Sequence, residues 1–241
     1  MLEKTKGIVL NRIKYSDSGI IVRLYTRKFG RQSFLIRGMR NTKAGRHNIL
    51  FQPLFILDLE MNYKHSREMQ VLKEFSVSFA PYEIHSDIRK SCVALFLGEV
   101  LTSVLKEESP HEEMFDFIEE SIIYFDSCKE AFANFHIAFL AGLSSFLGFQ
   151  AGARTDNNDT FFDLKNGSFV QMPPVHGNYA NETVSNILAD FYVASYDTAG
   201  KIPLTGTMRN EVLETLVKYY SLHLPALRKL KSLEVLKEVF G

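Results

Sequence analysis

The chain has 241 residues, 46% of them apolar and 23% charged, which is typical of a globular protein and excludes long disordered stretches. No apolar run reaches the roughly 18 residues of a membrane-spanning helix, and residues 1–7 lack the apolar core of a signal peptide, so we expect a cytoplasmic protein without membrane association. The net charge of zero conceals an uneven distribution: residues 1–80 carry 15 basic and 6 acidic side chains (+9), and the remainder carries −9. The basic first third therefore favours a polyanionic partner.

Period-2 alternation predicts strands throughout the first third of the chain. They span residues 7–13, 20–26, 31–37, 53–63 and 69–79, and a polar loop covers residues 38–48. Five strands in about 75 residues with no helix between them indicate a small antiparallel barrel. A five-stranded oligonucleotide-binding (OB) barrel is the natural candidate, and an SH3-like barrel is the structural alternative.

An acid-free stretch marks the candidate binding surface. No Asp or Glu occurs from residue 18 to residue 57. A solvated sheet face ordinarily mixes both signs, so this stretch is better explained by a site for a phosphate backbone. An acidic protein partner or an anionic lipid is the alternative. The candidate DNA-binding cations are Arg23, Arg27, Lys28, Arg31, Arg37, Arg40, Lys43 and Arg46.

Tyr25 lies between Arg23 and Arg27 on the same predicted strand face. An aromatic ring between two guanidinium groups can stack on a base while they hold phosphates, so Tyr25 joins the candidate site. The alternative is a strand tyrosine that is half-buried within the fold.

After Pro81 the apolar spacing changes to about 3.6 residues, which predicts helices. Their apolar faces lie within residues 93–104, 114–125, 131–147, 183–196, 208–222 and 232–240. The third segment is apolar nearly all round and should form the centre of a helical domain, with His136 as a core histidine. Asn166-Gly167 between two short apolar runs predicts a β-hairpin at about 156–174. The expected fold is α+β, with an OB domain at 1–80 and a mainly α-helical domain at 81–241.

No catalytic signature occurs in the sequence: phosphate-binding loops, nucleophile elbows, HExxH and CxxC are all absent. The acidic pairs at 107–108, 112–113 and 119–120 are interpreted as a solvated helix face. Asp156, Asp159 and His176 match no metal-ligand spacing. The two cysteines, Cys92 and Cys128, are too few for a disulfide framework. The absence of these motifs does not exclude an enzyme, but it favours a binding protein. We therefore expect a protein that is not an enzyme and has no cofactor or metal.

The opening TKGIVLNRIKYSDSGIIVRLYTRKFGRQSFLIRGMR resembles the start of the RecO family of recombination mediators. A GIVL strand, a YSDS-type turn, a strand ending in YT, a turn glycine and an RG-x-R strand end recur there in this order. PLFILDLEMNY with VLKEF, the FLGFQ segment and the LKSLEVLKEVF tail resemble later family blocks. The resemblance covers most of the chain and is strongest over residues 1–80.

One region departs from the family pattern. Many members follow the FLGFQ-like segment with two cysteine pairs that bind zinc, whereas this chain has no cysteine there. The segment FFDLKNGSFV stands in that place, so the metal site is not carried over. We expect a hairpin that packs instead through Phe161, Phe162, Phe169 and Pro173.

The resemblance implies an OB barrel, a helical domain and no known catalytic residues. Members bind single- and double-stranded DNA, anneal complementary strands and help load RecA onto strands coated by single-strand-binding protein. The implied partners are DNA, RecR, the acidic C-terminal tail of single-strand-binding protein and, indirectly, RecA, at the nucleoid. The rival hypothesis is an adaptor whose basic barrel binds acidic protein tails without a direct DNA role. A nuclease is a more distant third.

Overall fold

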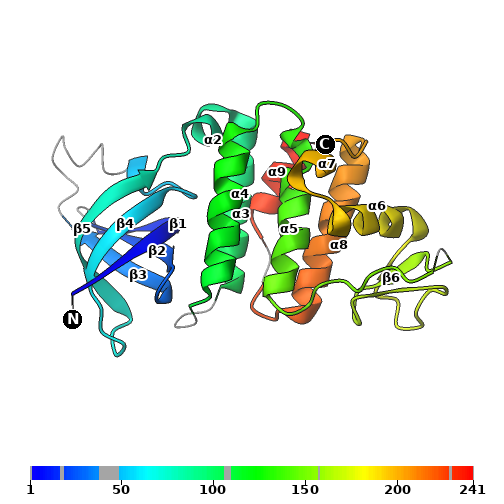
Figure 1. The fold of residues 1–241 in the computed structure, drawn as a ribbon, viewed down its shortest axis with the longest axis horizontal. Coiled ribbons are helices and arrows are strands. Elements are labelled where there is room, and N and C mark those ends of the chain that lie inside the picture. Colours follow the sequence, from blue (N-terminus) through cyan, green and yellow to red (C-terminus); the bar gives the residue numbers. More distant parts are fainter. Residues whose placement is uncertain are drawn as a thin grey trace. The chain divides into compact units, whose positions relative to one another are not determined.

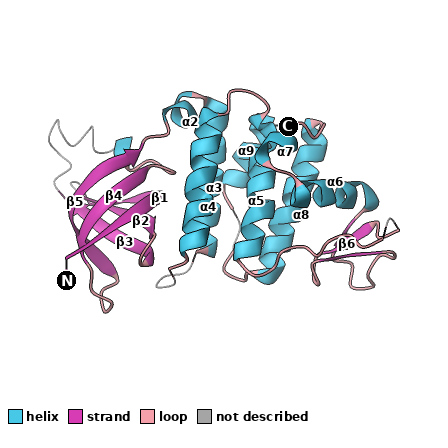
Figure 2. Cartoon of the chain, viewed as in Figure 1, coloured by secondary structure: helices cyan, strands magenta, loops and turns pink. Residues whose placement is uncertain are grey.

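The computed structural model describes residues 2–16, 19–37, 49–105, 110–156, 158–227 and 230–240. The chain forms two compact units, Met1–Ser127 and Cys128–Gly241 (Figure 1). The first unit contains a β-barrel followed by helices, and the second is mainly helical with a small sheet (Figure 2). The predicted α+β fold class is therefore confirmed.

In the described part of the first unit, five strands close into the OB-type barrel that the sequence predicts. They are β1 (Leu2–Ser16), β2 (Gly19–Thr26), β3 (Gly30–Arg37), β4 (Ile56–Asn62) and β5 (Met69–Phe79). The order around the barrel is β1-β2-β3-β5-β4. Neighbouring strands are antiparallel except β3 and β5, which pair in parallel at Ser33–Met69 and Phe34–Gln70.

Strand β1 is longer than predicted because it takes part in two pairings. Residues 2–8 pair with β4, and residues 7–16 pair with β2. The register shifts between Val9 and Asn11, and such a bulge bends a strand and lets it serve two neighbours. The burial pattern changes along the strand for the same reason, so simple alternation reveals only its middle part.

The barrel interior is filled by apolar side chains from alternate strand positions. Val22 and Leu24, which the alternation places on one face of β2, both point into this core and are fully buried. The connection between β3 and β4 adds two phenylalanines. The core consists of Val9, Val22, Leu24, Phe34, Phe51, Phe55, Leu57, Leu59 and Met61.

Helices α2 (Tyr82–Ser86), α3 (Ile88–Val104) and α4 (Glu112–Ser127) complete the first unit. Asp87 caps α3, because its side chain accepts a hydrogen bond of 2.8 Å from the backbone N–H of Arg89. Helix α3 passes very close to β1: a Cβ atom at Gly98 would lie only 2.6 Å from the Leu10 carbonyl oxygen. Glycine at this position therefore permits the close approach.

The second unit is built around α5, which is buried on nearly all sides as its sequence predicts. Its helical elements are η1 (Phe132–Asn134), α5 (Phe135–Phe146), α6 (Glu182–Val193), α7 (Tyr196–Ala199), α8 (Gly206–His223) and α9 (Ser232–Phe240). Arg209 of α8 donates hydrogen bonds to Asn134 Oδ1, at 2.9 Å, and to the carbonyl of Phe240, at 3.0 Å, so it ties α9 to the centre of the unit. Within the described residues, none of the helices has both the length and the apolar character needed to span a bilayer.

The predicted hairpin is present in the second unit. Strands β6 (Phe161–Asp163) and β7 (Ser168–Val170) pair in an antiparallel manner, and β8 (Tyr179–Ala180) adds a strand beside β6. Gly167 has φ of +64°, the left-handed conformation that Asn-Gly turns supply. Strand β8 was not predicted, because two residues are too short to show alternation.

Candidate nucleic-acid interface

The structure describes part of the predicted DNA-binding set on one side of the barrel. Arg23 and Tyr25 lie on β2, Arg27 and Lys28 in the turn to β3, and Arg31 on β3. Arg37 ends β3, but its side chain and the whole of Arg40, Lys43 and Arg46 lie outside the described residues. Arg23 is opposite Ser33, and Tyr25 is opposite Arg31, so these four residues share the outer face of the barrel.

Tyr25 lies on the predicted outer face, but helix α4 covers it. Only 1% of the residue is exposed, and its ring stacks on that of Phe115 with 6.0 Å between ring centroids. Burial raises the pKa of the Tyr25 hydroxyl to about 12. This corrects the expectation that the ring is available to a base: Tyr25 joins the barrel to a helix.

Arg27 and Arg31 are also engaged by the helices. The Nη2 atom of Arg27 lies 3.2 Å from Glu112 Oε2 and 3.0 Å from Asp116 Oδ2 of α4. The Arg31 guanidinium donates a hydrogen bond to the Thr102 carbonyl of α3. Glu112 is exposed, as expected for a solvated helix face, but it also contacts the barrel through Arg27, which the sequence does not reveal.

Lys28 remains exposed and Arg23 half-buried, and neither forms an ion pair with a described acid. Lys6 lies next to Arg27, since the Arg27 backbone N–H donates to the Lys6 carbonyl at 3.0 Å. The Lys6 ammonium pairs with Glu119 of α4 at 2.7 Å. Lys6 could not be assigned to the site from the sequence, because only the pairing of β1 with β2 brings it to this rim.

The turn between β4 and β5 supplies a second basic element. Lys64, His65 and Arg67 are exposed there. The buried side chain of Gln70 holds the turn: its Oε1 accepts from Lys64 N at 3.0 Å, and its Nε2 donates to the carbonyls of Lys64 and Arg67 at 2.9 and 3.1 Å. The turn is therefore fixed in shape, and its cations project from a rigid base.

This second turn lies beside the β2–β3 turn that carries Lys28. The rings of Phe29 and Tyr63, one from each turn region, stack with 4.1 Å between centroids. Arg31 and Arg67 also help to line a small cavity of about 140 Å³ between β3 and the β4–β5 turn. OB barrels bind oligonucleotides with strands 2–3 and the loop between strands 4 and 5. The exposed cations thus lie where this fold binds nucleic acid.

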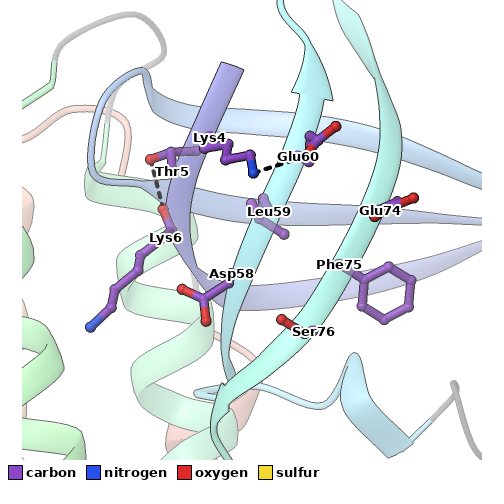
Figure 3. A pocket seen from close by; sticks show the side chains of 9 residues that line it. All are labelled: Lys4, Thr5, Lys6, Asp58, Leu59, Glu60, Glu74, Phe75 and Ser76. Atoms are coloured by element: carbon purple, nitrogen blue, oxygen red, sulfur yellow. Dashed lines mark hydrogen bonds and ion pairs between the residues drawn. The ribbon is translucent and has the colours of Figure 1, made fainter. Parts of the chain in front are cut away.

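A larger hollow of about 520 Å³ lies on the outer face of β1, β4 and β5 (Figure 3). Its two lysines, Lys4 and Lys6, stand among three carboxylates, those of Asp58, Glu60 and Glu74. Lys4 pairs with Glu60 at 3.4 Å. Mixed charge with an excess of acid does not suit a polyanion, so this hollow is not part of the candidate interface. The Lys6 ammonium is directed away from the hollow, toward Glu119 of α4 (Figure 3), and only this end of the side chain belongs to the basic rim.

The described residues contain no group of three or more His, Cys, Asp or Glu side chains that could hold a metal ion. Asp159 Oδ2 accepts hydrogen bonds from Thr155 Oγ1 and Asp156 N, whereas His176 pairs with Asp163 at 3.2 Å. His136 is fully buried, and burial, together with the charge of Arg209, lowers its pKa to about 3. It is therefore a neutral core histidine.

Comparison with known proteins identifies the family. Residues 1–79 match the family described as Recombination protein O N terminal, and residues 85–234 match Recombination protein O C terminal. Proteins named DNA repair protein RecO are similar over the full length of both chains: that of Bacteroides fragilis is 38% identical and that of Phocaeicola vulgatus 37% identical. A third, from Flavobacterium psychrophilum, is 33% identical over 99% of each chain.

The chain belongs to the RecO family.

The two RecO family matches meet near Pro81, where the barrel ends. The compact units divide later, at Ser127, because α2, α3 and α4 pack with the barrel. The helices that follow the first family match are therefore structurally part of the unit that carries the candidate interface.

In this RecO-family chain, aromatic packing holds the hairpin where the resemblance would place a zinc site. Phe162 is fully buried, and its ring lies 5.2 Å from Tyr219 and 4.9 Å from Phe169. Phe161 is half-buried against Tyr179. Pro173 is exposed, which corrects the expectation that it packs, because it lies beyond β7 in the connection to β8.

Proposed function

We propose that this protein acts in DNA repair and recombination as a non-enzymatic mediator that binds DNA through its basic barrel. Membership of the RecO family supports the general role. The observation that carries DNA binding is the pair of adjacent turns, in which Lys28, Lys64 and Arg67 are exposed at the part of an OB barrel that binds oligonucleotides.

The remaining predicted cations extend this interface in the proposal. Arg23 lies on the same barrel face, and Arg27 and Arg31 lie beside the two turns. Arg37, Arg40, Lys43 and Arg46 continue the basic run along the chain. Lysine and arginine contacts to phosphates carry no base information, so we expect binding of single- and double-stranded DNA with little sequence preference and strong dependence on salt.

Annealing follows from the same chemistry in this proposal. A surface that neutralises the phosphates of two strands lowers their mutual repulsion and needs no catalytic group. We further propose that the protein helps to load RecA onto strands coated by single-strand-binding protein. Its partners would be RecR and the acidic C-terminal tail of single-strand-binding protein, at the nucleoid in the cytoplasm. The family resemblance supports these finer roles.

The test is fluorescence anisotropy of a labelled single-stranded oligonucleotide, titrated across salt. The double variant Lys64→Glu/Arg67→Glu should weaken binding at least about tenfold and reduce the slope of log K against log salt by about 1.4, which corresponds to two phosphate contacts on single strands. The matched control Lys129→Glu/Lys165→Glu changes the same total charge at exposed positions of the second unit and should leave the slope unchanged. Equal losses in both variants would contradict the assignment of the turn.

The adaptor hypothesis gives a different result. A barrel that binds only acidic protein tails would bind an acidic peptide, while the wild-type protein would bind the oligonucleotide weakly and without salt dependence. A nuclease would degrade DNA in the presence of magnesium, whereas we expect the DNA to remain intact. These two measurements use the same wild-type protein and separate the three functions.

A further inference from the structure

Two cations of the barrel rim are held by carboxylates of helix α4. Arg27 contacts both Glu112, at 3.2 Å, and Asp116, at 3.0 Å. Lys6, on the neighbouring strand, contacts Glu119 at 2.7 Å. The two cations are adjacent, because the Arg27 backbone N–H donates to the Lys6 carbonyl. The ion pairs therefore form one continuous contact between the helix and the rim.

The spacing of these acids directs them toward the barrel. Positions 112, 116 and 119 are separated by four and three residues, so they lie on one face of α4. The stacking of Phe115 on Tyr25 fixes this face against β2. Two other acids of the helix, Glu113 and Glu120, are exposed and form no ion pair within the described residues.

Carboxylate and phosphate groups bind the same atoms of a basic side chain. A guanidinium accepts either group through parallel N–H···O hydrogen bonds. The side chains of Arg27, Asp116 and Glu112 are 37%, 41% and 67% exposed, so a phosphate can reach Arg27 without movement of the helix. Exposed ion pairs such as those of Arg27 contribute little to stability, and a phosphate can therefore displace them. The Lys6–Glu119 pair is less exposed on the side of the acid, at 14%, but the Lys6 side chain is 39% exposed.

We infer that the acidic face of α4, formed by Glu112, Asp116 and Glu119, is an internal competitor that occupies Lys6 and Arg27 and lowers the affinity of the barrel for DNA. This inference rests on the proposed DNA-binding function. It adds Lys6 to the DNA-binding surface and divides that surface into two sets. Lys28, Lys64 and Arg67 are available at once, whereas Lys6 and Arg27 bind phosphate only after it displaces a carboxylate.

The experiment compares two sets of charge-neutralising variants of the full chain by oligonucleotide anisotropy across salt. The variant Glu112→Gln/Asp116→Asn/Glu119→Gln frees both cations. Each freed cation should raise affinity about fivefold at 0.1 M salt and steepen the slope by about 0.7, as expected for one more phosphate contact on single strands. The control Glu113→Gln/Glu120→Gln removes acids from the same helix that do not contact the rim, and its slope should equal that of the wild type.

Other results of this binding experiment would contradict either the inference or the proposed function. Equal gains in both variants would show that α4 acts only through its overall charge, and an unchanged slope in the first variant would show that Lys6 and Arg27 do not bind DNA. Either result would overturn the inference while leaving the proposed function intact. Absence of salt-dependent binding by the wild-type protein would instead contradict the proposed function itself.

Two further variants guard against a change in folding. The double variant Glu112→Gln/Asp116→Asn keeps Glu119, whose side chain is only 14% exposed, and so changes no largely buried acid. It frees Arg27 but not Lys6, and should therefore show about half of the logarithmic gain in affinity. Addition of Arg27→Gln to this double variant should abolish the gain, because the freed cation is then missing. A gain that persisted without Arg27 would contradict the competition.

Discussion

The ring of Tyr25 on β2 lies stacked against the ring of Phe115 on α4, with 6.0 Å between their centroids. Both residues are fully buried. This contact lies on the outside of the barrel, so it does not belong to the barrel core. It explains why α4 falls into the same compact unit as the strands, and it brings the acidic face of the helix to the basic rim.

Replacement of Tyr25 by Leu separates packing from base stacking. Loss of the ring should lower the free energy of unfolding by about 1–3 kcal/mol, since a buried aromatic contact is removed. DNA affinity under folding conditions should change less than about twofold, whereas loss of a stacked base would cost about 1–3 kcal/mol. Urea denaturation and anisotropy measure the two quantities. A tenfold loss of affinity in the folded variant would restore Tyr25 as a base-stacking residue.

Gly98→Ala tests the close approach of α3 to β1. The added Cβ would meet the Leu10 carbonyl oxygen at 2.6 Å, and backbone atoms cannot move aside easily. We expect a loss of about 1–3 kcal/mol in unfolding free energy, even though alanine favours helices. Leu95→Ala, at an exposed position of the same helix, should change stability by less than about 0.5 kcal/mol. A stabilised Gly98→Ala variant would show that the helix can shift outward.

Most of the fold could be predicted because its signals are local. The bounds of β2, β3 and β5 lie within one residue of those that alternation predicts, and Gly30, with φ of +64°, marks the turn between β2 and β3. The Asn166-Gly167 dipeptide likewise locates the hairpin. The full extent of β1 could not be predicted, because its two halves pair with different strands and the bulge shifts its alternation.

The candidate site could be predicted only in part. Alternation places Arg23 and Tyr25 on the outer face of β2, but it contains no information about a helix that covers that face. Glu112 looks solvated in a linear sequence, and only tertiary packing brings it to Arg27. Lys64 and Arg67 fall outside the acid-free stretch, and they join the site through the pairing of strands.

The buried His136 predicts a dependence of stability on pH. Its pKa is about 3 in the folded protein and 6.5 as an ordinary histidine. Below pH 6.5 the unfolded chain therefore takes up a proton that the folded protein does not, so stability falls as pH falls. Through this residue alone, the free energy of unfolding should decrease by about 1 kcal/mol between pH 7 and 5.5.

The variant His136→Gln isolates this effect. The other titrating groups remain, so its unfolding free energy should still depend on pH. The change between pH 7 and 5.5 should be about 1 kcal/mol smaller than in the wild type, because the contribution of His136 is missing. Urea denaturation at the two pH values supplies both numbers. Identical pH dependence in the two proteins would mean that the pKa of His136 is the same in the folded and the unfolded protein.

The aromatic packing of the hairpin predicts stability without metal. Phe162→Ala should lower the unfolding free energy by about 3–5 kcal/mol, because a fully buried ring among aromatic neighbours is lost. Addition of a chelator should leave the thermal midpoint of the wild-type protein unchanged. A midpoint that fell with chelator and recovered with zinc would show that a metal supports the unit after all.

Gln70 tests whether the shape of the β4–β5 turn matters for DNA binding. Its side chain makes hydrogen bonds to Lys64 N, the Lys64 carbonyl and the Arg67 carbonyl, so Gln70→Leu keeps every charge but releases the turn. Loosened cations must be ordered on binding, and each immobilised side chain costs about 0.5–1.5 kcal/mol. We expect DNA affinity to fall about threefold to tenfold while the salt slope stays that of the wild type, because the number of phosphate contacts is unchanged. A reduced slope would show instead that the turn had left the interface.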